Sequence, residues 1–305
     1  MLATAVTKLP TGDGWAFEFK WDGVRALFDV SDTGLRITSR TGRDVTTTYP
    51  ELAGLAEGAD DALVDGEIVA IRDGRPSFEL LQSRMNVRSA VEARRLAAGA
   101  PVTFVAFDLL RRYGVELTAR PYSERRATME RWLGERPDWT ISPSFDDGPA
   151  TEAAARQHGL EGIVAKRVDS AYRAGVRSGD WAKLRFVHTG DFAVIGWEAS
   201  ADRPDDLSSL ILATWTSAGP VYVGKVGSGL SGALATAVRR LLHDAPSCVL
   251  ADEPPASPGR VAHWVRPEVV VEVEFTERTD DGRLRHPVLR RLRSDKTVDQ
   301  AQADA

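Results

Sequence analysis

Cysteine is almost missing from this chain of 305 residues, which contains only Cys248. A single cysteine cannot form an internal disulfide, and it excludes a cysteine-based zinc site within one chain. The sequence also lacks an apolar run long enough to span a membrane. Residues 1–4 do not begin a basic segment followed by an apolar stretch, so we expect no signal peptide and a reduced, cytoplasmic setting.

An excess of positive charge is missing as well, because the formal net charge is −5. This balance argues against a protein coated in basic residues, although a local patch is enough for phosphate contacts. One basic run extends from Arg285 to Lys296 and includes Arg290 and Arg291. Such a run is either a DNA-facing strip or an ordinary solvated strand or turn, and both interpretations stay open.

Lysine is scarce, since only six of the 39 basic residues are lysines. An amine can lose its proton and attack phosphorus, whereas a guanidinium stays charged and is a poor nucleophile. Lys20 opens the string Lys-Trp-Asp-Gly-Val-Arg at residues 20–25, directly after a β-like run. A Lys-x-Asp-Gly-x-Arg match arises by chance only about 0.005 times in such a chain. The string predicts a lysine nucleophile in a phosphate-handling site; the alternative is a hairpin turn at Asp22 and Gly23.

Charged residues also stand inside apolar runs. Glu67 lies in a strand predicted over residues 62–71, where a buried carboxylate needs a cation, a metal or a ribose hydroxyl. Its alternative is an exposed turn at a strand edge. In residues 181–185, strand alternation sends Lys183 and Arg185 to one face, which suits two cations gripping one phosphate.

Two further strings are ambiguous when taken singly. In residues 161–167, strict alternation places Glu161 and Ile163 on one face and Lys166 on the other, unless a bulge intervenes. Phe107 follows an apolar run and precedes an acid. Taken alone, this phenylalanine fits a core position better than a platform for stacking a base.

The pattern of periodicity changes near residue 188. Before this point β-like runs alternate with helical segments, which predicts mixed antiparallel sheets with flanking helices. After it, five strand-like runs and one helical segment predict a small Greek-key barrel of the OB type. We therefore expect an α+β chain with domains over residues 1–187 and 188–305. The expected strands of the second domain cover residues 192–199, 209–216, 220–226, 261–265 and 269–276, and its helix covers 231–242.

In their order and spacing these strings resemble the motifs of the ATP-dependent DNA ligases, which belong to the covalent nucleotidyltransferase superfamily. The resemblance covers about residues 10–297 and is strongest to the ligase module of bacterial non-homologous end-joining DNA ligases. It rests on residues 20–25, 39–40, 65–67, 107–108, 161–166 and 181–185, on a terminal motif at 293–296, and on module-like strings at 14–23 and 281–287.

The resemblance implies an adenylation (nucleotidyltransferase) domain followed by an OB-fold domain. Lys20 would attack the α-phosphate of ATP and form a lysyl–AMP phosphoramidate. AMP would then pass to a 5′-phosphate at a break, and the adjacent 3′-hydroxyl would displace it. The implied cofactors are ATP and Mg²⁺ or Mn²⁺, and the implied partners are nicked or broken duplex DNA and end-joining repair proteins. We expect a monomer without membrane contact.

The resemblance also assigns roles to individual residues. Asp22, Lys183 and Arg185 would join Lys20 in the catalytic group. Glu67 and Glu161 would bind the metal. Arg285, Arg290 and Arg291 would meet DNA phosphates. The nucleotide would be bound by Glu18, which reads the adenine amino group, by Phe107, which stacks on the purine, and by Arg25, Arg40, Glu67, Ile163, Lys166, Lys183, Arg185, Asp295 and Lys296. Where Arg185 stands the family often has lysine, and arginine keeps the charge.

Three other functions stay open. A capping guanylyltransferase uses the same lysine chemistry without joining ends, and the terminal motif with the barrel sequence favours the ligase over it. An RNA ligase is the second enzyme, although RNA ligases usually lack this barrel. A non-catalytic OB-type nucleic-acid-binding protein would leave the lysine at position 20 unexplained.

Overall fold

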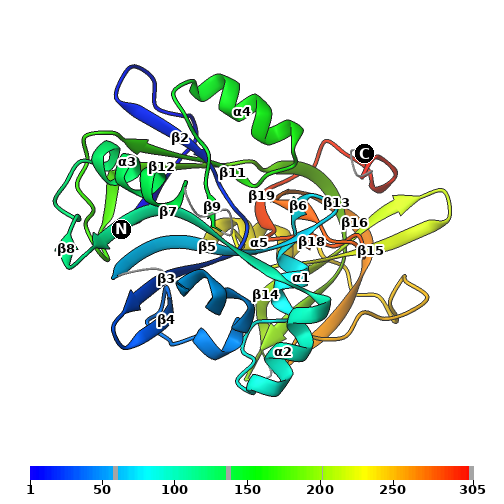
Figure 1. Ribbon diagram of the computed structural model, residues 1–305. Helices are drawn as coiled ribbons and strands as arrows, with labels where there is room; N and C mark the ends of the chain where they lie inside the picture. The colour runs from blue at the N-terminus through cyan, green and yellow to red at the C-terminus, as the bar shows by residue number, and fades with distance from the viewer. Residues whose placement is uncertain (58–60, 135–138, 201, 302–305) are drawn as a thin grey trace. The chain divides into compact units, whose positions relative to one another are not determined.

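The computed structural model describes residues 1–57, 61–134, 139–200 and 202–301. The chain forms two compact units, Met1–Phe186 and Val187–Ala305. The first unit contains two sheets with helices around them, and the second is rich in strands (Figure 1). Within the described residues, no helix is both long and apolar enough to cross a membrane.

The larger sheet of the first unit is almost entirely antiparallel. Its strands follow the order β4 (Gly34–Ser39), β3 (Val24–Ser31), β5 (Ala62–Arg72), β7 (Val102–Arg112) and β8 (Val115–Glu116). Two short strands join this path, β6 (Arg75–Pro76) beside β5 and β9 (Thr140–Ile141) parallel to β7. In β3, Ala26, Phe28 and Val30 are buried in alternation with less buried neighbours, as a strand with one apolar face requires.

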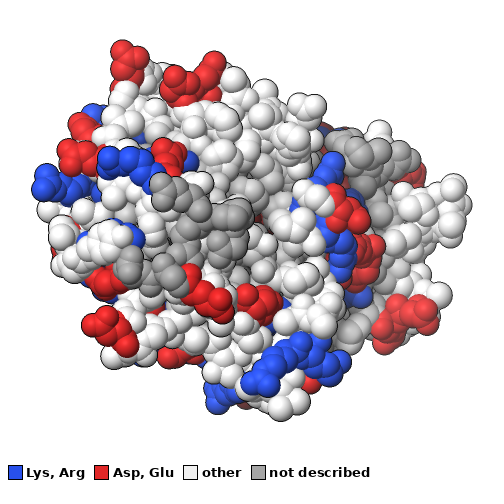
Figure 2. Space-filling view, in the orientation of Figure 1, with Lys and Arg blue, Asp and Glu red and all other residues white. Residues whose placement is uncertain are grey.

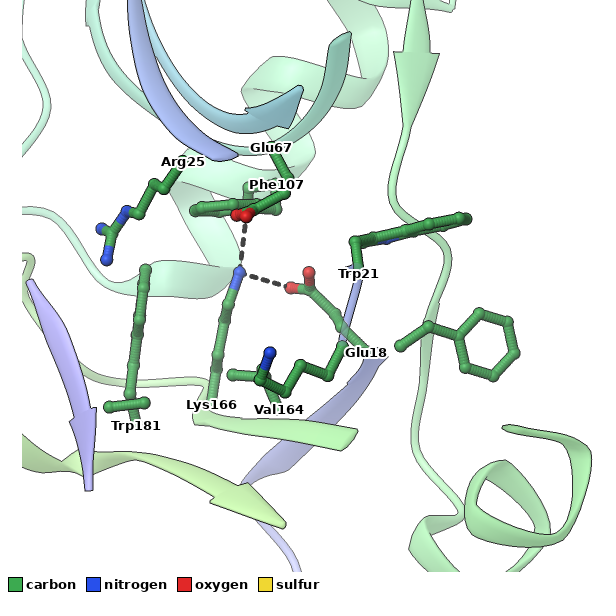
Figure 3. A pocket seen from close by; sticks show the side chains of 11 residues that line it. Glu18, Trp21, Arg25, Glu67, Phe107, Val164, Lys166 and Trp181 are labelled. Atoms are coloured by element: carbon green, nitrogen blue, oxygen red, sulfur yellow. Dashed lines mark hydrogen bonds and ion pairs between the residues drawn. The ribbon is translucent and has the colours of Figure 1, made fainter. Parts of the chain in front are cut away.

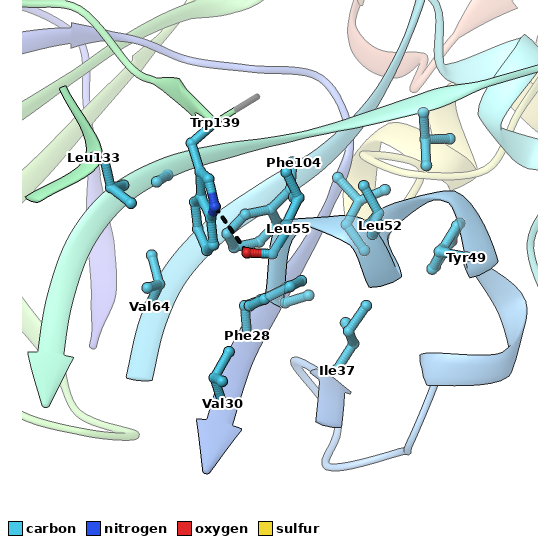
Figure 4. Packing of buried hydrophobic residues seen from close by; sticks show 14 of the residues in the cluster. Phe28, Val30, Ile37, Tyr49, Leu52, Leu55, Val64, Phe104, Leu133 and Trp139 are labelled. Carbon is cyan, nitrogen blue, oxygen red and sulfur yellow. Dashed lines mark hydrogen bonds between the residues drawn. The ribbon is translucent and has the colours of Figure 1, made fainter. Parts of the chain in front are cut away.

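The apolar face of this sheet carries the main core of the unit. Phe28 packs against Phe104 and Trp139, with ring centroids 5.3 and 5.1 Å away (Figure 4). The indole N–H of Trp139 donates to the carbonyl oxygen of Leu55 at 3.0 Å, so the one polar atom of this ring is satisfied. Two 3-10 segments follow β4, Thr46–Thr48 and Pro50–Ala56; Tyr49 between them and Leu52 and Leu55 of the second belong to the same cluster.

The second sheet of the unit has the order β1 (Leu2–Val6), β12 (Arg177–Arg185), β11 (Gly162–Arg167), β2 (Trp15–Phe19) and β10 (Ser144–Phe145). The pair β1–β12 is parallel and the other pairs are antiparallel. The sequence did not predict β1. One face packs with α4 (Gly148–Gln157) around Phe17, Ala155 and Ile163, which leaves the other face for polar side chains.

The remaining helices of the first unit are α1 (Phe78–Gln82), α2 (Ala90–Gly99) and α3 (Tyr122–Leu133). Ser77 and Ser89 cap the first two, because each side chain accepts a hydrogen bond from a backbone N–H in the first turn. The third begins directly after Pro121, a residue that suits a helix start. Buried side chains of α3 pack against β7, so this helix supports the strand that carries Phe107.

The second unit is built on a five-stranded sheet with the order β15 (Gly219–Val226), β14 (Arg203–Thr216), β13 (His188–Ser200), β16 (Arg260–Phe275) and β19 (Val288–Leu292). One helix, α5 (Gly232–Leu241), packs with the sheet core. A two-stranded hairpin, β17 (Glu277–Arg278) with β18 (Leu284–Arg285), and a 3-10 turn at Val298–Gln300 complete the described part.

Two strand predictions for this unit need correction. The segments predicted at residues 261–265 and 269–276 belong to one strand, β16. The strand continues through Pro267 because a bulge lies there, where the pairing with β13 shifts register between Val194 and Gly196. The fifth strand of the sheet is instead β19, which lies inside the basic run. Leu289 of β19 is buried, whereas Arg290 and Arg291 are both exposed, because the pairing with β16 shifts register between Glu272 and Val273.

Candidate active site

A pocket in the first unit is lined by side chains from both of its sheets (Figure 3). The small sheet supplies its polar face, and the large sheet supplies side chains from the start of β3 and from the middle of β5 and β7. The lining residues are Ala3, Glu18, Phe19, Lys20, Trp21, Arg25, Glu67, Phe107, Val164, Lys166 and Trp181.

Lys20 follows β2 and is fixed at both its backbone and its side chain. Its N–H donates to the carbonyl oxygen of Gly162 at 2.9 Å, and its ammonium forms an ion pair with Glu161. The other oxygen of Glu161 lies 3.0 Å from Nε of Arg185. Glu161 therefore bridges the amine and the guanidinium, with only 12% of its side chain exposed.

Strict alternation predicts that Glu161 and Ile163 lie on the same face of the strand, but the structure places them on opposite faces. Glu161 precedes the first residue of β11 and points to the pocket side, where Lys20 lies. Gly162 permits this turn of the chain, because a Cβ there would come within 2.0 Å of the carbonyl oxygen of Leu184. Ile163 is fully buried in the core behind the sheet, and Val164 lines the pocket wall in its place.

Lys183 lies on the same face as these groups. It pairs in register with Val164, which lines the pocket, and stands two residues from Trp181 on β12. Burial lowers the pKa of Lys183, and the nearby charges of Arg185 and Lys20 act in the same direction. A cluster of cations thus surrounds Lys20, an arrangement that suits a polyanionic phosphate chain.

Glu67 reaches the pocket from β5. Burial raises its pKa to about 8, although the charges of Lys20 and Arg25 act to lower it. The turn that carries Lys20 lies against β5 at Gly23, where a Cβ would approach the carbonyl oxygen of Ile68 to 2.3 Å. The glycine of the Lys-x-Asp-Gly string is therefore required by close packing of two backbone segments.

Glu67 and Glu161 both act electrostatically on Lys20 and on each other. Among the described residues no group of three or more His, Cys, Asp or Glu side chains could hold a metal ion. Mg²⁺, however, is commonly held by one or two carboxylates together with substrate phosphates. The two glutamates fit such an ion, or Mn²⁺, shared with a nucleotide.

Glu18 and Lys166 form a buried ion pair at the base of the pocket. Their Oε1 and Nζ atoms are 2.6 Å apart, and Nζ also donates to the carbonyl oxygen of Phe107 at 2.9 Å (Figure 3). The ammonium lies 4.6 Å from the ring centroids of both Phe107 and Trp181. Burial lowers the pKa of Lys166, while Glu18 and Asp108 act to raise it.

Phe107 both packs and lines the pocket. Its ring meets Trp181 edge to face at 6.1 Å and is partly buried against a small apolar cluster. Arg25 lies 5.5 Å from its centroid. The ring therefore packs against a core cluster and also lines the pocket, and its stacking on a base stays a prediction.

Arg25 is held by a fully buried carboxylate. Its Nε donates to Asp65 at 2.9 Å, and its Nη1 donates to the carbonyl oxygen of Met1 at 2.6 Å. Burial alone would lower the pKa of Arg25, but the charge and hydrogen bonds of Asp65 raise it overall. Tyr172 donates to the same carboxylate at 2.7 Å. Arg25 is therefore a fixed cation on the pocket wall.

Six of the predicted residues of the first unit are not among those that line the pocket: Asp22, Arg40, Glu161, Ile163, Lys183 and Arg185. Arg40 is exposed after β4, and its backbone N–H donates to the carbonyl oxygen of Arg25 at 3.2 Å. Asp22 lies in the turn between β2 and β3, beside Trp21. Neither side chain is among those that form the pocket wall.

The terminal motif lies in the second unit and is held by its own ion pairs. Arg293 donates to Asp295 at 2.9 and 2.8 Å, and these hydrogen bonds lower the pKa of Asp295. Lys296 and Arg293 both reach Asp191 of β13, at 2.5 and 2.9 Å. The motif is therefore ordered by contacts within its own unit.

The basic run is more neutral than its sequence suggests. Arg290 pairs with Glu274 at 2.6 Å and Arg291 pairs with Glu272 at 2.7 Å, both across the β16–β19 ladder. Arg285 pairs with Glu277 on the hairpin. On the face drawn in Figure 2, acidic and basic side chains likewise lie side by side. These acids come from strands distant in sequence, so the run looks more basic than the surface is.

Two residues that line the pocket, and one that contacts Glu18 from behind it, escaped sequence reasoning. Ala3 belongs to β1, which the sequence does not predict, and the string at residues 181–185 indicates no role for Trp181. Tyr122 of α3 donates a hydrogen bond to Glu18 from 104 residues away. No local periodicity reports such a contact, although a buried tyrosine normally finds a partner for its hydroxyl.

Family models and known relatives match the chain along its length. A model described as "ATP dependent DNA ligase domain" matches residues 1–185, and one described as "ATP dependent DNA ligase C terminal region" matches 203–296. The multifunctional non-homologous end joining protein LigD of Mycolicibacterium smegmatis is 36% identical over 294 residues, covering 94% of this chain and 37% of the relative. The LigD protein of Pseudomonas aeruginosa is 34% identical over 308 residues, covering 97% and 35%.

Solved structures give the same result. Mycobacterial DNA ligase D complexed with ATP and MES is 32% identical, with a TM-score of 0.55, over 99% of this chain and 98% of that one. The ligase domain of Mycobacterium tuberculosis LigD has a TM-score of 0.53 at 32% identity, with the same coverage. The chain spans a little over a third of the length of the LigD proteins it matches.

Proposed function

The chain belongs to the ATP-dependent DNA ligase family, and we propose that it seals 5′-phosphate/3′-hydroxyl breaks in duplex DNA through a lysyl–AMP intermediate. Its predicted fold class, an α+β adenylation domain followed by an OB-fold domain, is confirmed by the LigD ligase-domain structures. Residues 1–187 and 188–305 are proposed as these two domains. The observation that carries the proposal is the pocket in which Lys20, bridged by Glu161 to Arg185, faces further cations and Glu18.

The first step is the attack of Nζ of Lys20 on the α-phosphorus of ATP. A phosphorus–nitrogen bond forms, the bond between the α-phosphorus and the bridging oxygen breaks, and pyrophosphate leaves. The amine must first lose a proton, and Glu161 is the carboxylate already in contact with it. Arg185 holds the other oxygen of Glu161 and so keeps this acceptor in place.

The charge of the triphosphate is met by the cations on the pocket face. Lys183 and Arg185 share that face by strand alternation, and Arg25 stays charged through Asp65. Glu18 is proposed to accept from the adenine amino group and Phe107 to stack on the purine. Glu67 and Glu161 would hold Mg²⁺ or Mn²⁺, which when bound neutralises phosphate charge.

The later steps need DNA. AMP passes from Lys20 to the 5′-phosphate, and the 3′-hydroxyl then displaces AMP to form the phosphodiester. Asp295 and Lys296 are proposed to contact the leaving pyrophosphate in the first step. Arg290 and Arg291 are proposed to contact DNA phosphates, a role in which they would exchange their glutamate partners.

The cellular setting is part of the same proposal. The LigD relatives are named for non-homologous end joining, which favours DNA repair with end-joining proteins as partners. A single cysteine suits the cytoplasm, and we propose that the protein acts on broken duplex DNA as a monomer.

The test is ATP-dependent sealing of a single nick with a labelled 5′-phosphate. We expect sealing with ATP, a transient DNA-adenylate, and little product with GTP or with a 5′-hydroxyl. Equal sealing of an all-RNA nick would favour the RNA ligase alternative. Lysyl-nucleotide formation with GTP in preference to ATP would favour a capping-type enzyme.

A further inference from the structure

Tyr122 belongs to none of the strings that resemble ligase motifs. It is the first residue of α3, and only 1% of it is exposed. Its hydroxyl donates to Oε1 of Glu18. Arg126, one turn further along the helix, brings Nη1 to 3.9 Å from the same oxygen.

All the cations and donors around Glu18 gather at one of its two oxygens. Lys166 also contacts Oε1, at 2.6 Å. Among the hydrogen bonds of the described residues, none involves Oε2 of Glu18. Glu18 itself lines the pocket. The carboxylate is thus clamped through one oxygen, and the other remains an acceptor for a ligand.

The donors at Oε1 have fixed roles. Burial and the neighbouring Glu18 raise the pKa of Tyr122 well above its ordinary value, so the hydroxyl keeps its proton. Lys166 is itself held by the carbonyl oxygen of Phe107. A carboxylate gripped in this way cannot rotate to exchange its two oxygens without breaking buried hydrogen bonds.

We propose that Tyr122, supported by Arg126, is a positioning residue for purine recognition: it holds Glu18 so that Oε2 accepts from an exocyclic amino group at purine position 6. The inference rests on the proposed function and deepens it, because it adds a determinant of base specificity on α3. A fixed acceptor rewards a 6-amino group and rejects a 6-oxo group, since two facing acceptors leave a buried polar group unpaired.

The test compares two nucleotides that differ only at position 6. Tyr122→Phe keeps the ring, which lies 4.9 Å from Nζ of Lys166, and removes the hydroxyl alone. Adenylation of Lys20 is measured with ATP and with purine ribonucleoside triphosphate, which has hydrogen in place of the amino group. We expect kcat/KM to fall about tenfold for ATP and less than about twofold for the analogue.

Tyr172→Phe is the matched control. It removes another buried hydroxyl from the same region, but one that donates to Asp65 and not to Glu18. We expect this variant to lower kcat/KM for adenylation by the same factor with ATP and with the analogue. The ratio of the two rates is taken within one preparation, so any fraction of unfolded protein cancels.

The outcomes separate the two levels of the argument. If Tyr122→Phe lowers kcat/KM equally for both nucleotides, so that the ratio of ATP to analogue is unchanged, the positioning role is overturned while the ligase chemistry stands. Wild-type protein that forms no adduct with ATP would overturn the proposed function and this inference with it. The inference is supported if the ratio of kcat/KM for ATP to kcat/KM for the analogue falls below the wild-type value in Tyr122→Phe and keeps that value in Tyr172→Phe.

Discussion

Replacement of Lys166 by methionine tests the buried ion pair under the pocket. Only 2% of the Lys166 side chain and 3% of the Glu18 side chain are exposed. Methionine keeps the unbranched stem against the surrounding rings and removes the charge. Glu18 then keeps Tyr122 and the more distant Arg126, but loses its nearest cation. Breaking a buried pair in this way costs about 3–5 kcal/mol of folding free energy.

The double variant Lys166→Met/Glu18→Gln separates two contributions to that loss of folding free energy: the attraction between the two side chains, and the cost of leaving the Glu18 charge buried without its partner. Because glutamine carries no charge to leave unpaired, we expect the double variant to recover about 1–3 kcal/mol relative to the sum of the single changes. Amide hydrogen exchange in β2 and β11 reports the opening of the first unit without interference from the second. Lys8→Met, at an exposed lysine of the same unit, should stay within about 0.5 kcal/mol of wild type.

Two results would refute this reasoning. A loss below about 1 kcal/mol in Lys166→Met would mean that the pair does not stabilise the fold as its burial implies. Strict additivity in the double variant would mean that Lys166 and Glu18 do not interact energetically, whatever their separation.

Three further predictions concern Glu67, the terminal motif and the basic run. The pKa of Glu67 is raised from 4.5 to about 8, so between these pH values the folded state binds more protons at this carboxyl than the unfolded state does. The free energy of unfolding should therefore fall as pH rises from 4.5 to about 8. Urea denaturation of Glu67→Gln should show a smaller fall over the same range. Asp295→Ala or Lys296→Ala should slow self-adenylation much more than sealing of a pre-adenylated nick, and equal losses on both substrates would place the motif elsewhere. Replacement of Arg290 and Arg291 by alanine should weaken binding to nicked duplex and flatten its log–log salt dependence by about one to two, with adenylation nearly unchanged.

The glutamates opposite the arginines provide the control for the last prediction. Glu272→Gln with Glu274→Gln releases Arg291 and Arg290 from their ion pairs. If these arginines meet DNA, this variant should bind nicked duplex more tightly and with a steeper salt dependence. An unchanged slope in both variants would show that the arginines serve only the β16–β19 ladder.

Local patterns predicted most of the elements because their burial is regular. The strand expected at residues 62–71 differs from β5 by one residue, and the helix expected at residues 231–242 differs from α5 by one residue at each end. A continuous apolar run of strand length predicts β5, and apolar residues at helical spacing, among them Leu234 and Val238, predict α5. By contrast β1 is short and pairs with β12 far along the chain, so its strand character depends on a partner that local reasoning cannot see.

Site prediction failed where backbone geometry or distant partners decide the outcome. The turn at Gly162 brings Glu161 to the pocket side, and alternation then buries Ile163 behind the sheet. The arginines of β19 looked free because their glutamates lie on β16, earlier in the sequence. Tyr122 gave no sequence signal, because its contact with Glu18 joins residues 104 positions apart in the chain.

The most direct test of the central claim is the mass of the protein after incubation with ATP and Mg²⁺. Wild type should gain one AMP, located on Lys20 by peptide mapping. Lys20→Ala and Lys20→Arg should gain none, the second because a guanidinium keeps the charge and is a poor nucleophile. Both variants should bind ATP and melt near the wild-type temperature. An AMP adduct that persists in either variant would contradict the account, because another group would then be the nucleophile.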